Sequence, residues 1–369
     1  MRKLFKQDIT EILYGATLLG GGGGGSLKFG LDMLTKLESE GESIELDLLE
    51  LDEINDNEYG TMVAGLGSPV AMIDSKLPMF GPDAVYAFRA FQKAFKFEGK
   101  DVKYLYSGEM GGFNTFVPML VAILSDKDIS KRIKFLDTDG NGRAVPELGT
   151  SLNSMRGFPP YPMGLGNLKG DEIIVYPIDD HAGEVVARTL CMAYDMRIGF
   201  STWGMNKNEL KLHSSEGCIT YAQNIGKAFL NAQSDKTDIM EGLKNAMPIR
   251  EFCRGIIEKI DLKQEGGFDY GVTVIADKDG KKYYIDFKNE NLVVRDDMGK
   301  AYITAPEVIG LIDFDNNYPL TNADTKVGMN LLVTLSPVDS RWWSEDFKAY
   351  ECWFPELKKI GFDGKQIRF

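Results

Sequence analysis

Six consecutive glycines, Gly20 to Gly25, constrain this 369-residue chain more than any other segment. Glycine costs about 0.5–1 kcal/mol relative to alanine inside a helix or strand, so the run predicts a tight loop. Before it, the capping-box pattern at Asp8 to Glu11 predicts a helix that continues through Leu19. After it, Ser26 can cap a second helix, whose apolar residues recur at helical spacing up to Leu37.

A glycine loop between two helices has two interpretations. The free N–H groups and the positive dipole end of the second helix could hold an anion or an oxyanion. The candidate substrate-binding residues of the loop are Gly22, Gly23, Gly24, Gly25 and Ser26. Alternatively, the glycines form only a flexible hinge.

Nucleotide binding by this loop fits less well. A P-loop ends in Gly-Lys-Ser/Thr, whereas Ser26-Leu27 follows the glycines here. A dinucleotide-binding fingerprint needs a strand before its glycines, and a helix is predicted there. Asp47 does lie near the distance at which that fingerprint places its acidic residue, so this interpretation is weakened rather than excluded.

The composition is that of an ordinary globular protein, with 43% hydrophobic and 26% charged residues, and the length predicts two domains. A net charge of −13 without a basic block argues against a nucleic acid or an anionic membrane as partner. The longest apolar run, Thr115 to Leu124, is too short to span a bilayer. Acidic residues interrupt the N-terminal region where a signal peptide is apolar, and the four cysteines are far apart. We therefore expect a reduced, cytoplasmic protein.

Strand-like and helix-like segments alternate in the N-terminal half. Strands are predicted at Ile44–Leu48, Thr61–Leu66, Val102–Tyr106 and Ile133–Asp137. Pro82 to Phe97 predicts a helix with aromatic residues on one face. This alternation predicts the α/β fold class, with an N-terminal α/β domain built on a largely parallel sheet.

A segment rich in proline and glycine, Gly157 to Gly166, is predicted to be a loop or linker. We therefore predict two domains, residues 1–168 and 169–369. In the second, a strand is predicted at Glu172–Ile178, helices at 181–196 and 217–234, and mainly β structure from about residue 250. Asp277 to Gly280 is predicted to be a hairpin turn.

Two acidic, glycine-rich segments directly follow predicted strands: Ser107 to Asn114, and Asp137 to Glu147. Ligands of open α/β sheets bind beyond the carboxyl ends of the strands, so these segments are the predicted site. The candidate catalytic residues are Asp137, Asp139, Glu147 and the cation Arg143, and the candidate substrate-binding residues are Glu109, Gly111, Gly112 and Asn114. Acid–base catalysis and binding of a divalent metal would both use such carboxylates. The alternative is a turn whose Asp and Asn side chains bond their own backbone.

An EF-hand calcium loop is excluded for the second segment. Asp137 to Gly142 fits its first six positions, but the twelfth is Leu148 rather than glutamate. Glu147 comes one residue too early, and a strand rather than a helix precedes the segment.

The segments Leu18–Gly25, Glu109–Asn114 and Asp137–Leu148, in this order, resemble the S-methyl-thiohydantoin desulfurase-like family. The resemblance continues through Arg254-Gly255, Gly266–Phe268 and Phe287–Leu292 and so covers the chain from about residue 8 to its end. Cys218 stands where threonine is expected, and His181 where asparagine is expected. The resemblance implies an N-terminal α/β domain, a C-terminal domain that begins near residue 169, and an association with hydantoinase and oxoprolinase enzymes.

The reaction that this resemblance implies is hydrolytic removal of sulfur from a five-membered thiohydantoin ring. Our hypothesis is that water, activated by Asp139 or Glu147 or by a metal that they hold, attacks the ring carbon that bears sulfur. Glycine-loop N–H groups or Arg143 would stabilise the resulting negative charge. Asn114 and Glu109 would orient the ring.

Two other functions remain open. The chain could bind the ring without converting it, as a small-molecule-binding or partner subunit of a hydantoinase or oxoprolinase-type system. It could also be a nucleotide-dependent enzyme that uses the glycine loop. For the hydrolase and for the non-catalytic ring binder, the expected ligand is a small cyclic amide or thioamide. We also expect the chain to form a homo-oligomer.

Overall fold

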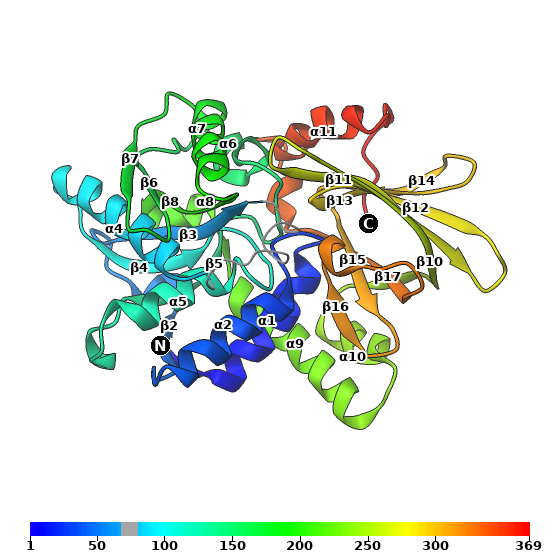
Figure 1. Cartoon of the computed structure of the whole chain (residues 1–369), viewed down its shortest axis with the longest axis horizontal. Helices are drawn as coiled ribbons and strands as arrows, with labels where there is room; N and C mark the ends of the chain where they lie inside the picture. The colour runs from blue at the N-terminus through cyan, green and yellow to red at the C-terminus, as the bar shows by residue number, and fades with distance from the viewer. Residues whose placement is uncertain (68–79) are drawn as a thin grey trace.

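The computed structural model describes residues 1–67 and 80–369, which form two β-sheets with helices around them (Figure 1). Sheet A contains, in spatial order, β1 (Arg2–Phe5), β2 (Glu45–Leu49), β5 (Lys134–Asp139), β4 (Val102–Ser107), β3 (Tyr59–Gly67), β8 (Arg197–Asn206), β6 (Met163–Gly166) and β7 (Glu172–Val175), and β9 (Ser215–Glu216) pairs with β5. Strands β2, β5, β4 and β3 run parallel at the centre, which confirms the predicted class. Antiparallel strands extend both edges: β7 lies within the strand predicted at Glu172–Ile178, whereas β1, β6 and β8 were not predicted.

Helices cover both faces of sheet A. The helices of the described residues are α1 (Lys6–Leu19), α2 (Leu27–Ser39), α4 (Pro82–Phe97), α5 (Phe116–Ser125), α6 (Leu152–Met155), α7 (Asp180–Ala193), α8 (Lys207–His213), α9 (Cys218–Asp235), α10 (Ile239–Ala246) and α11 (Phe354–Lys359). The last of them, α11, packs on the second β-sheet rather than on sheet A. Val63 and Phe135 pack among α1, α2, α4, α5 and α9 on one face, whereas their neighbours Met62 and Leu136 pack with α7 and α8 on the other. This alternation is the two-residue period of a strand that is buried on both sides.

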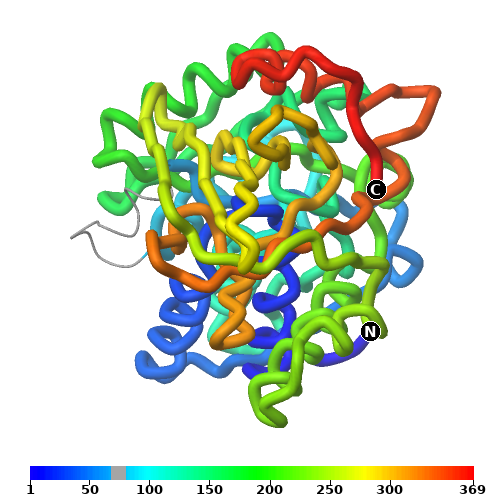
Figure 2. Tube along the Cα trace, turned by 90° about the vertical axis from the view of Figure 1, so that its right-hand side faces the viewer, coloured from blue at the N-terminus to red at the C-terminus, as the bar shows by residue number. Residues whose placement is uncertain are grey.

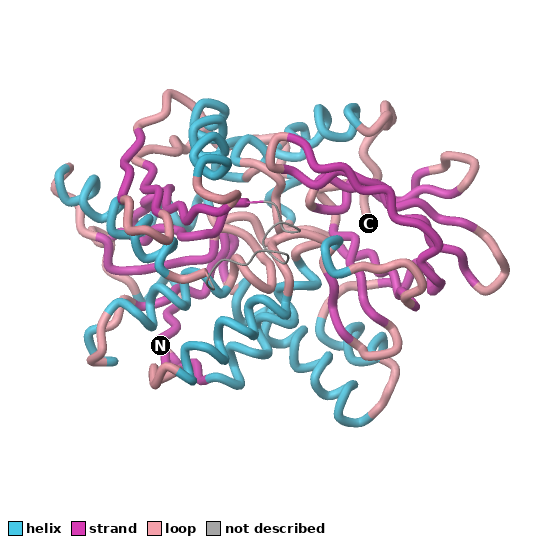
Figure 3. Tube along the Cα trace, viewed as in Figure 1, coloured by secondary structure: helices cyan, strands magenta, loops and turns pink. Residues whose placement is uncertain are grey.

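Sheet B is antiparallel throughout. Its strands, in spatial order, are β14 (Ala301–Thr304), β13 (Glu290–Asp296), β12 (Lys282–Lys288), β11 (Phe268–Asp277), β10 (Arg250–Glu265), β17 (Asn330–Ser336), β15 (Val308–Asp313) and β16 (Tyr318–Leu320). It lies in front of the blue N-terminal helices in Figure 2, and loops gather between the two sheets in Figure 3. The predicted change to β structure near residue 250 and the hairpin turn after β11 are both confirmed.

Two details at the helix starts differ from the sequence prediction. Helix α1 begins at Lys6, so Asp8 lies in its first turn, where its carboxylate accepts the Phe5 N–H at 2.9 Å. Ser26 immediately precedes α2 as predicted, but its hydroxyl donates to Asp324 Oδ1 at 2.7 Å rather than capping the helix. The predicted helix through Leu37 is otherwise present.

The predicted linker, Gly157 to Gly166, is partly wrong because its last residues form the buried strand β6. The two glycines of β6, Gly164 and Gly166, allow a close approach to α4 rather than a turn. A Cβ on Gly164 would lie 2.3 Å from the carbonyl oxygen of Ala87, and one on Gly166 would lie 2.3 Å from the Ala87 nitrogen. Composition alone cannot distinguish this use of glycine from a loop.

Sheet A extends past the predicted domain boundary at residues 168 and 169, because β7, β8 and β9 follow it in the chain. Sheet B begins only at Arg250. The division at 168 and 169 therefore stays a prediction. Among the described residues, no helix is long and apolar enough to cross a bilayer.

We predict that Gly164→Ala destabilises the protein by about 1–3 kcal/mol, because the added methyl group would overlap the backbone of α4. The midpoint of urea unfolding measures this loss. Gly149→Ala is the matched control, since a Cβ there meets no heavy atom within 4 Å. Equal midpoints for the two variants would contradict the packing explanation.

Candidate functional site

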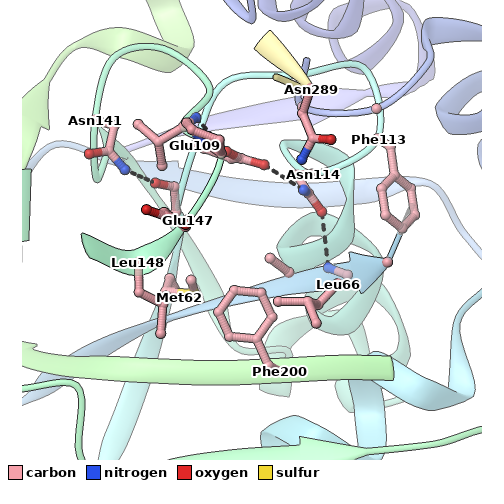
Figure 4. A pocket seen from close by; sticks show the side chains of 18 of the residues that line it. Met62, Leu66, Glu109, Phe113, Asn114, Asn141, Glu147, Leu148, Phe200 and Asn289 are labelled. Atoms are coloured by element: carbon pink, nitrogen blue, oxygen red, sulfur yellow. Dashed lines mark hydrogen bonds between the residues drawn. The ribbon is translucent and has the colours of Figure 1, made fainter. Parts of the chain in front are cut away.

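A cavity of about 760 Å³, including its mouth, opens beyond the carboxyl ends of β3, β4 and β5 (Figure 4). One wall is apolar and includes Met62, Leu66 and Phe200. The opposite wall is polar and includes Glu109 and Asn114 from the segment after β4. The cavity therefore lies where the sequence placed the site, at the carboxyl ends of parallel strands.

Glu109 presents its carboxylate to this cavity. Its Oε1 accepts the Asn114 Nδ2–H at 2.6 Å, and its Oε2 accepts the Val145 N–H at 2.9 Å. Burial raises the pKa of Glu109 to about 7, although these hydrogen bonds and the cations Arg188 and Arg143 favour the charged form. Near neutral pH this carboxyl group can therefore both accept and donate a proton.

Asn114 is fixed between three segments of the chain. Its Oδ1 accepts the Gly65 N–H of β3 at 2.9 Å, and its backbone N–H donates to the Gly24 carbonyl at 3.0 Å. These partners fix which end of the side-chain amide is oxygen and which is nitrogen. The NH₂ group must therefore face Glu109. Asn114 orients the carboxylate, rather than acting only as a clamp for a ligand.

Sheet B supplies a second carboxyl group to the cavity, from the corner between β12 and β13. Asn289 occupies this corner with a φ of +54°. Its N–H donates to the Asp269 carbonyl at 2.7 Å and its Oδ1 accepts the Asp269 N–H at 2.9 Å. Figure 4 shows the amide nitrogen of Asn289 pointing toward Asn114. This corner places Glu290, the next residue, in the cavity lining.

Glu290 is almost completely buried, with 2% of its surface exposed. Burial, and secondarily the charge of Glu109, raise the pKa of Glu290 to about 8. Within the described residues, its Oε2 has no hydrogen-bond partner. A Cβ on Gly23 would lie 1.9 Å from Oε1, so this carboxyl group rests directly on the glycine run.

Glu147 also lines the cavity, and it forms an ion pair with a buried lysine. Its Oε2 lies 2.9 Å from Lys288 Nζ, which is also 2.9 Å from Glu356 Oε2. Burial alone would lower the pKa of Lys288, but the two carboxylates outweigh it and hold the pKa above its ordinary value. Glu147 thus lines the cavity while its carboxylate is paired with Lys288.

Helix α7 closes the side of the cavity with a second ion pair. Arg188 Nε donates to Glu184 Oε1 at 2.7 Å, and Arg188 NH1 donates to the Gly267 carbonyl at 2.9 Å. Glu184 Oε2 accepts the Leu148 N–H at 2.9 Å. These bonds connect α7 both to the segment after β5 and to sheet B.

Asp137 and Asp139 do not line the cavity. Asp137 Oδ1 accepts the N–H groups of Ile219 and Thr220, each at 2.9 Å, at the start of α9. Asp139 is completely buried, and its Oδ1 accepts the N–H groups of Asn141 at 2.8 Å and of Gly142 at 2.6 Å. Both carboxylates therefore bond backbone amides, as the alternative turn interpretation expected.

Asp139 nevertheless acts on the site through Asn141, which lines the cavity. The turn that it holds lets Asn141 Nδ2 donate to the Gly108 carbonyl at 2.9 Å. Burial and, to a smaller extent, the nearby charge of Glu109 together raise the pKa of Asp139 to about 7, although its hydrogen bonds favour the charged form. The two segments after β4 and β5 thus converge, as predicted.

Arg143 lies behind the cavity wall and is completely buried. Its guanidinium donates to the carbonyls of Pro306 and Glu307 and lies 4.5 Å from the ring centre of Trp353. Burial lowers its pKa to about 10, so it remains charged at neutral pH. Within the described part of the chain, its NH2 has no hydrogen-bond partner.

The glycine run is used for contact between backbones. A Cβ on Gly111 would lie 2.1 Å from the Gly24 carbonyl oxygen, and one on Gly112 would lie 2.4 Å from the Leu27 Cα. Gly24 and Gly25 line the cavity, whereas Gly22 and Gly23 line a neighbouring one. Ser26, Gly111 and Gly112 line neither.

The structure thus brings together Glu109, Asn114, Glu147, Gly24 and Gly25 from the predicted set. Sequence reasoning missed the cavity residues Glu184, Arg188, Phe200, Trp203, Asn289 and Glu290. The segment Phe287–Leu292 supported the family resemblance, and its polar run at the end of a predicted strand was a usable signal. The residues of α7 and β8 carry no comparable signal.

A divalent metal finds little support in these side chains. Across residues 1–67 and 80–369, no group of three or more His, Cys, Asp and Glu side chains is placed to hold an ion. The carboxylates that face the cavity are engaged with amides, with Lys288 or with the glycine run.

Comparison with known families and structures gives consistent results. The family model for the S-Me-THD-like N-terminal domain matches residues 7–177, and that for the S-Me-THD-like C-terminal domain matches residues 178–356. An X-ray structure of a protein from Chromobacterium violaceum is similar over 100% of both chains, with a TM-score of 0.81 and 21% sequence identity. At that identity the likeness shows the fold alone. The comparison with curated proteins found no match.

We predict that Glu290 makes the folded protein less stable as pH rises. Its pKa is raised from 4.5 to about 8 on folding, so its contribution is fully present below the unfolded pKa and is lost as pH rises through the folded pKa. Melting temperature measured between about pH 5 and pH 9 should therefore fall less for Glu290→Gln than for the wild type. Glu216→Gln, which changes an exposed glutamate, should keep the wild-type slope. Equal slopes for all three proteins would contradict the assignment.

Proposed function

This chain belongs to the S-Me-THD-like family, and on that premise we propose that it is a hydrolase acting on a small five-membered cyclic thioamide. The substrate is a thiohydantoin, and the reaction replaces the ring sulfur by oxygen to give a hydantoin. The observation that carries the proposal is the Glu109 carboxyl group, which has a pKa of about 7 and faces an apolar wall across the cavity.

The cavity suits a flat, mostly apolar ring with polar edges. Met62, Leu66 and Phe200 offer apolar surface for one face of the ring. The amide nitrogen of Asn289 can donate a hydrogen bond to a ring carbonyl at the polar edge. A pocket of this kind, apolar with few directed polar groups, is typical of sites for small molecules.

In the proposed reaction, ionised Glu109 accepts a proton from a water molecule while the water oxygen bonds to the ring carbon that bears sulfur. Neutral Glu290 protonates the sulfur on the resulting tetrahedral carbon. The carbon–sulfur bond then breaks as the new hydroxyl group becomes the ring carbonyl, and the hydroxyl proton returns to Glu290. The departing hydrosulfide takes up the proton held by Glu109 and leaves as hydrogen sulfide. From an S-methyl ring, protonation by Glu290 releases methanethiol, the hydroxyl proton moves to the ring nitrogen, and the proton on Glu109 restores Glu290. The unequal environments of the two carboxyl groups favour one as base and the other as acid.

The cations Arg188 and Arg143 would stabilise negative charge that develops on the ring. Asp139, which was expected to activate water, does not do so in this scheme. It is separated from the ring by Asn141, whose turn it holds, and therefore acts as a positioning residue. Glu147 keeps the cavity edge in place through its ion pair with Lys288.

We predict that Glu109→Gln lowers the rate of sulfide release from a thiohydantoin by about 10²–10⁴-fold, because the general base is lost. Ring binding, measured by the shift in melting temperature, should persist. Glu216→Gln is the control, since Glu216 is an exposed carboxylate outside the cavity. Unchanged release by Glu109→Gln would remove Glu109 from the mechanism. A wild-type protein that binds the ring but releases no sulfide would instead support the non-catalytic subunit.

The pH dependence of the rate follows from the same two groups. We predict that kcat/KM rises as pH increases through about 7, where Glu109 ionises, and falls above about 8, where Glu290 loses its proton. Initial rates of sulfide release across about pH 5 to pH 10 give the profile. A rate that is constant over this range would contradict the acid–base assignment.

A further inference from the structure

A second cavity, of about 590 Å³ including its mouth, lies on the other side of the glycine run. Its walls come from the glycines, from β10 of sheet B, and from the segment between β16 and β17. The catalytic scheme above does not use it.

The two cavities share two residues, Gly25 and Asn289. Gly24 faces the first cavity, whereas Gly22 and Gly23 face the second. The partition between the cavities is therefore largely glycine backbone, which is the thinnest wall that a polypeptide can build. At Gly25 and Asn289, a single residue contributes to the lining of both cavities.

This partition is held in place by its far side. The Asn322 N–H donates to the Gly22 carbonyl at 2.8 Å, and Asn322 Nδ2 donates to the Asn289 carbonyl at 2.8 Å. The Asn291 N–H donates to the Gly21 carbonyl at 2.8 Å. Gly25 and Asn289, which line both cavities, thus lie beside glycine and sheet B segments that are bonded to one another.

The walls of the second cavity select the chemistry of its occupant. Ile260, Leu262 and Phe287 supply an apolar side. The hydroxyl of Thr321 donates to Asp324 Oδ2 at 2.6 Å, and that of Thr325 donates to the Asn322 carbonyl at 2.7 Å. Each hydroxyl donates its only proton in one of these bonds. It can therefore interact with a ligand only as a hydrogen-bond acceptor.

Asp269 adds a carboxylate to the same lining. It disfavours an anionic group in the cavity, because like charges repel most strongly where water is excluded. The cavity therefore combines an apolar side with acceptors, and it lacks a side-chain cation among the residues described as its lining.

We propose that the second cavity receives the substituent carried by the substrate ring, namely an aliphatic chain that ends in a hydrogen-bond donor such as a carboxamide. This inference rests on the proposed function, because it places the ring in the first cavity. The chain passes beside Gly25 and Asn289, its carbons lie against Leu262 and Phe287, and its terminal NH₂ donates to the threonine hydroxyls.

The test compares four thiohydantoins that carry hydrogen, an isobutyl group, a carbamoylethyl group or a carboxyethyl group on the same ring carbon. The last two have nearly the same shape and differ in charge and in donors. We expect kcat/KM and binding affinity for the carbamoylethyl ring to exceed those for the carboxyethyl ring by at least about tenfold, with the isobutyl ring above the unsubstituted one. Equal values for all four rings would overturn the proposal.

Ala323→Phe fills the second cavity from the segment between β16 and β17 without touching the first. It should lower kcat/KM for the carbamoylethyl ring about tenfold and leave the unsubstituted ring unchanged. Leu262→Trp narrows the same cavity from β10 and, on a half-exposed strand position, serves if the first variant does not fold. Equal losses for both rings, or no loss for either, would contradict the assignment.

Binding measurements separate this proposal from the proposed function. If no ring is converted but the carbamoylethyl ring still binds more tightly than the carboxyethyl ring, and Ala323→Phe removes that preference, the second cavity is supported and hydrolysis is not. If rings are converted without any preference among substituents, hydrolysis is supported and the second cavity is not.

Discussion

The close contact between two glycine-containing backbones is the constraint on which the site depends. A Cβ on Gly24 would lie 2.2 Å from the Met110 carbonyl oxygen, and one on Gly111 would lie 2.1 Å from the Gly24 carbonyl oxygen. Side chains would hold these segments several ångströms apart. Because they touch, the loop between α1 and α2 reaches the end of β4, where Asn114 bonds it and Glu109 faces the cavity. The glycines were expected to let a substrate approach the backbone. Their first role in the structure is to let the two backbone segments contact each other.

Much of the N-terminal fold could be predicted from local patterns. Helix α4 has the bounds that its apolar face and its proline predicted, and the central strands lie within a few residues of their predicted positions. The site region followed from one general rule, that ligands bind at the carboxyl ends of parallel strands. That rule pointed to Glu109 and Asn114, both of which line the cavity.

The rest depends on contacts between residues far apart in the chain. Gly164 in β6 looked like part of a linker because nothing near it in sequence reveals that α4 packs against it. Asp137 and Asp139 looked like catalytic acids because a carboxylate that bonds backbone amides has the same sequence signature as one that faces a ligand. Glu290 could not be placed because its proximity to Glu109 arises only when sheet B docks beside sheet A.

The pairing of β8 with β3 has a consequence for how the gene could be divided. The two family models meet at residues 177 and 178, yet β3 lies before that junction and its antiparallel neighbour β8 lies after it. A fragment ending there would leave β3 with an unpaired edge, ready to join foreign strands. It would also lack Phe200, Asn289 and Glu290, and with them part of the cavity wall. The two matched halves therefore share one sheet and one cavity wall, so a recombination event could exchange them only together.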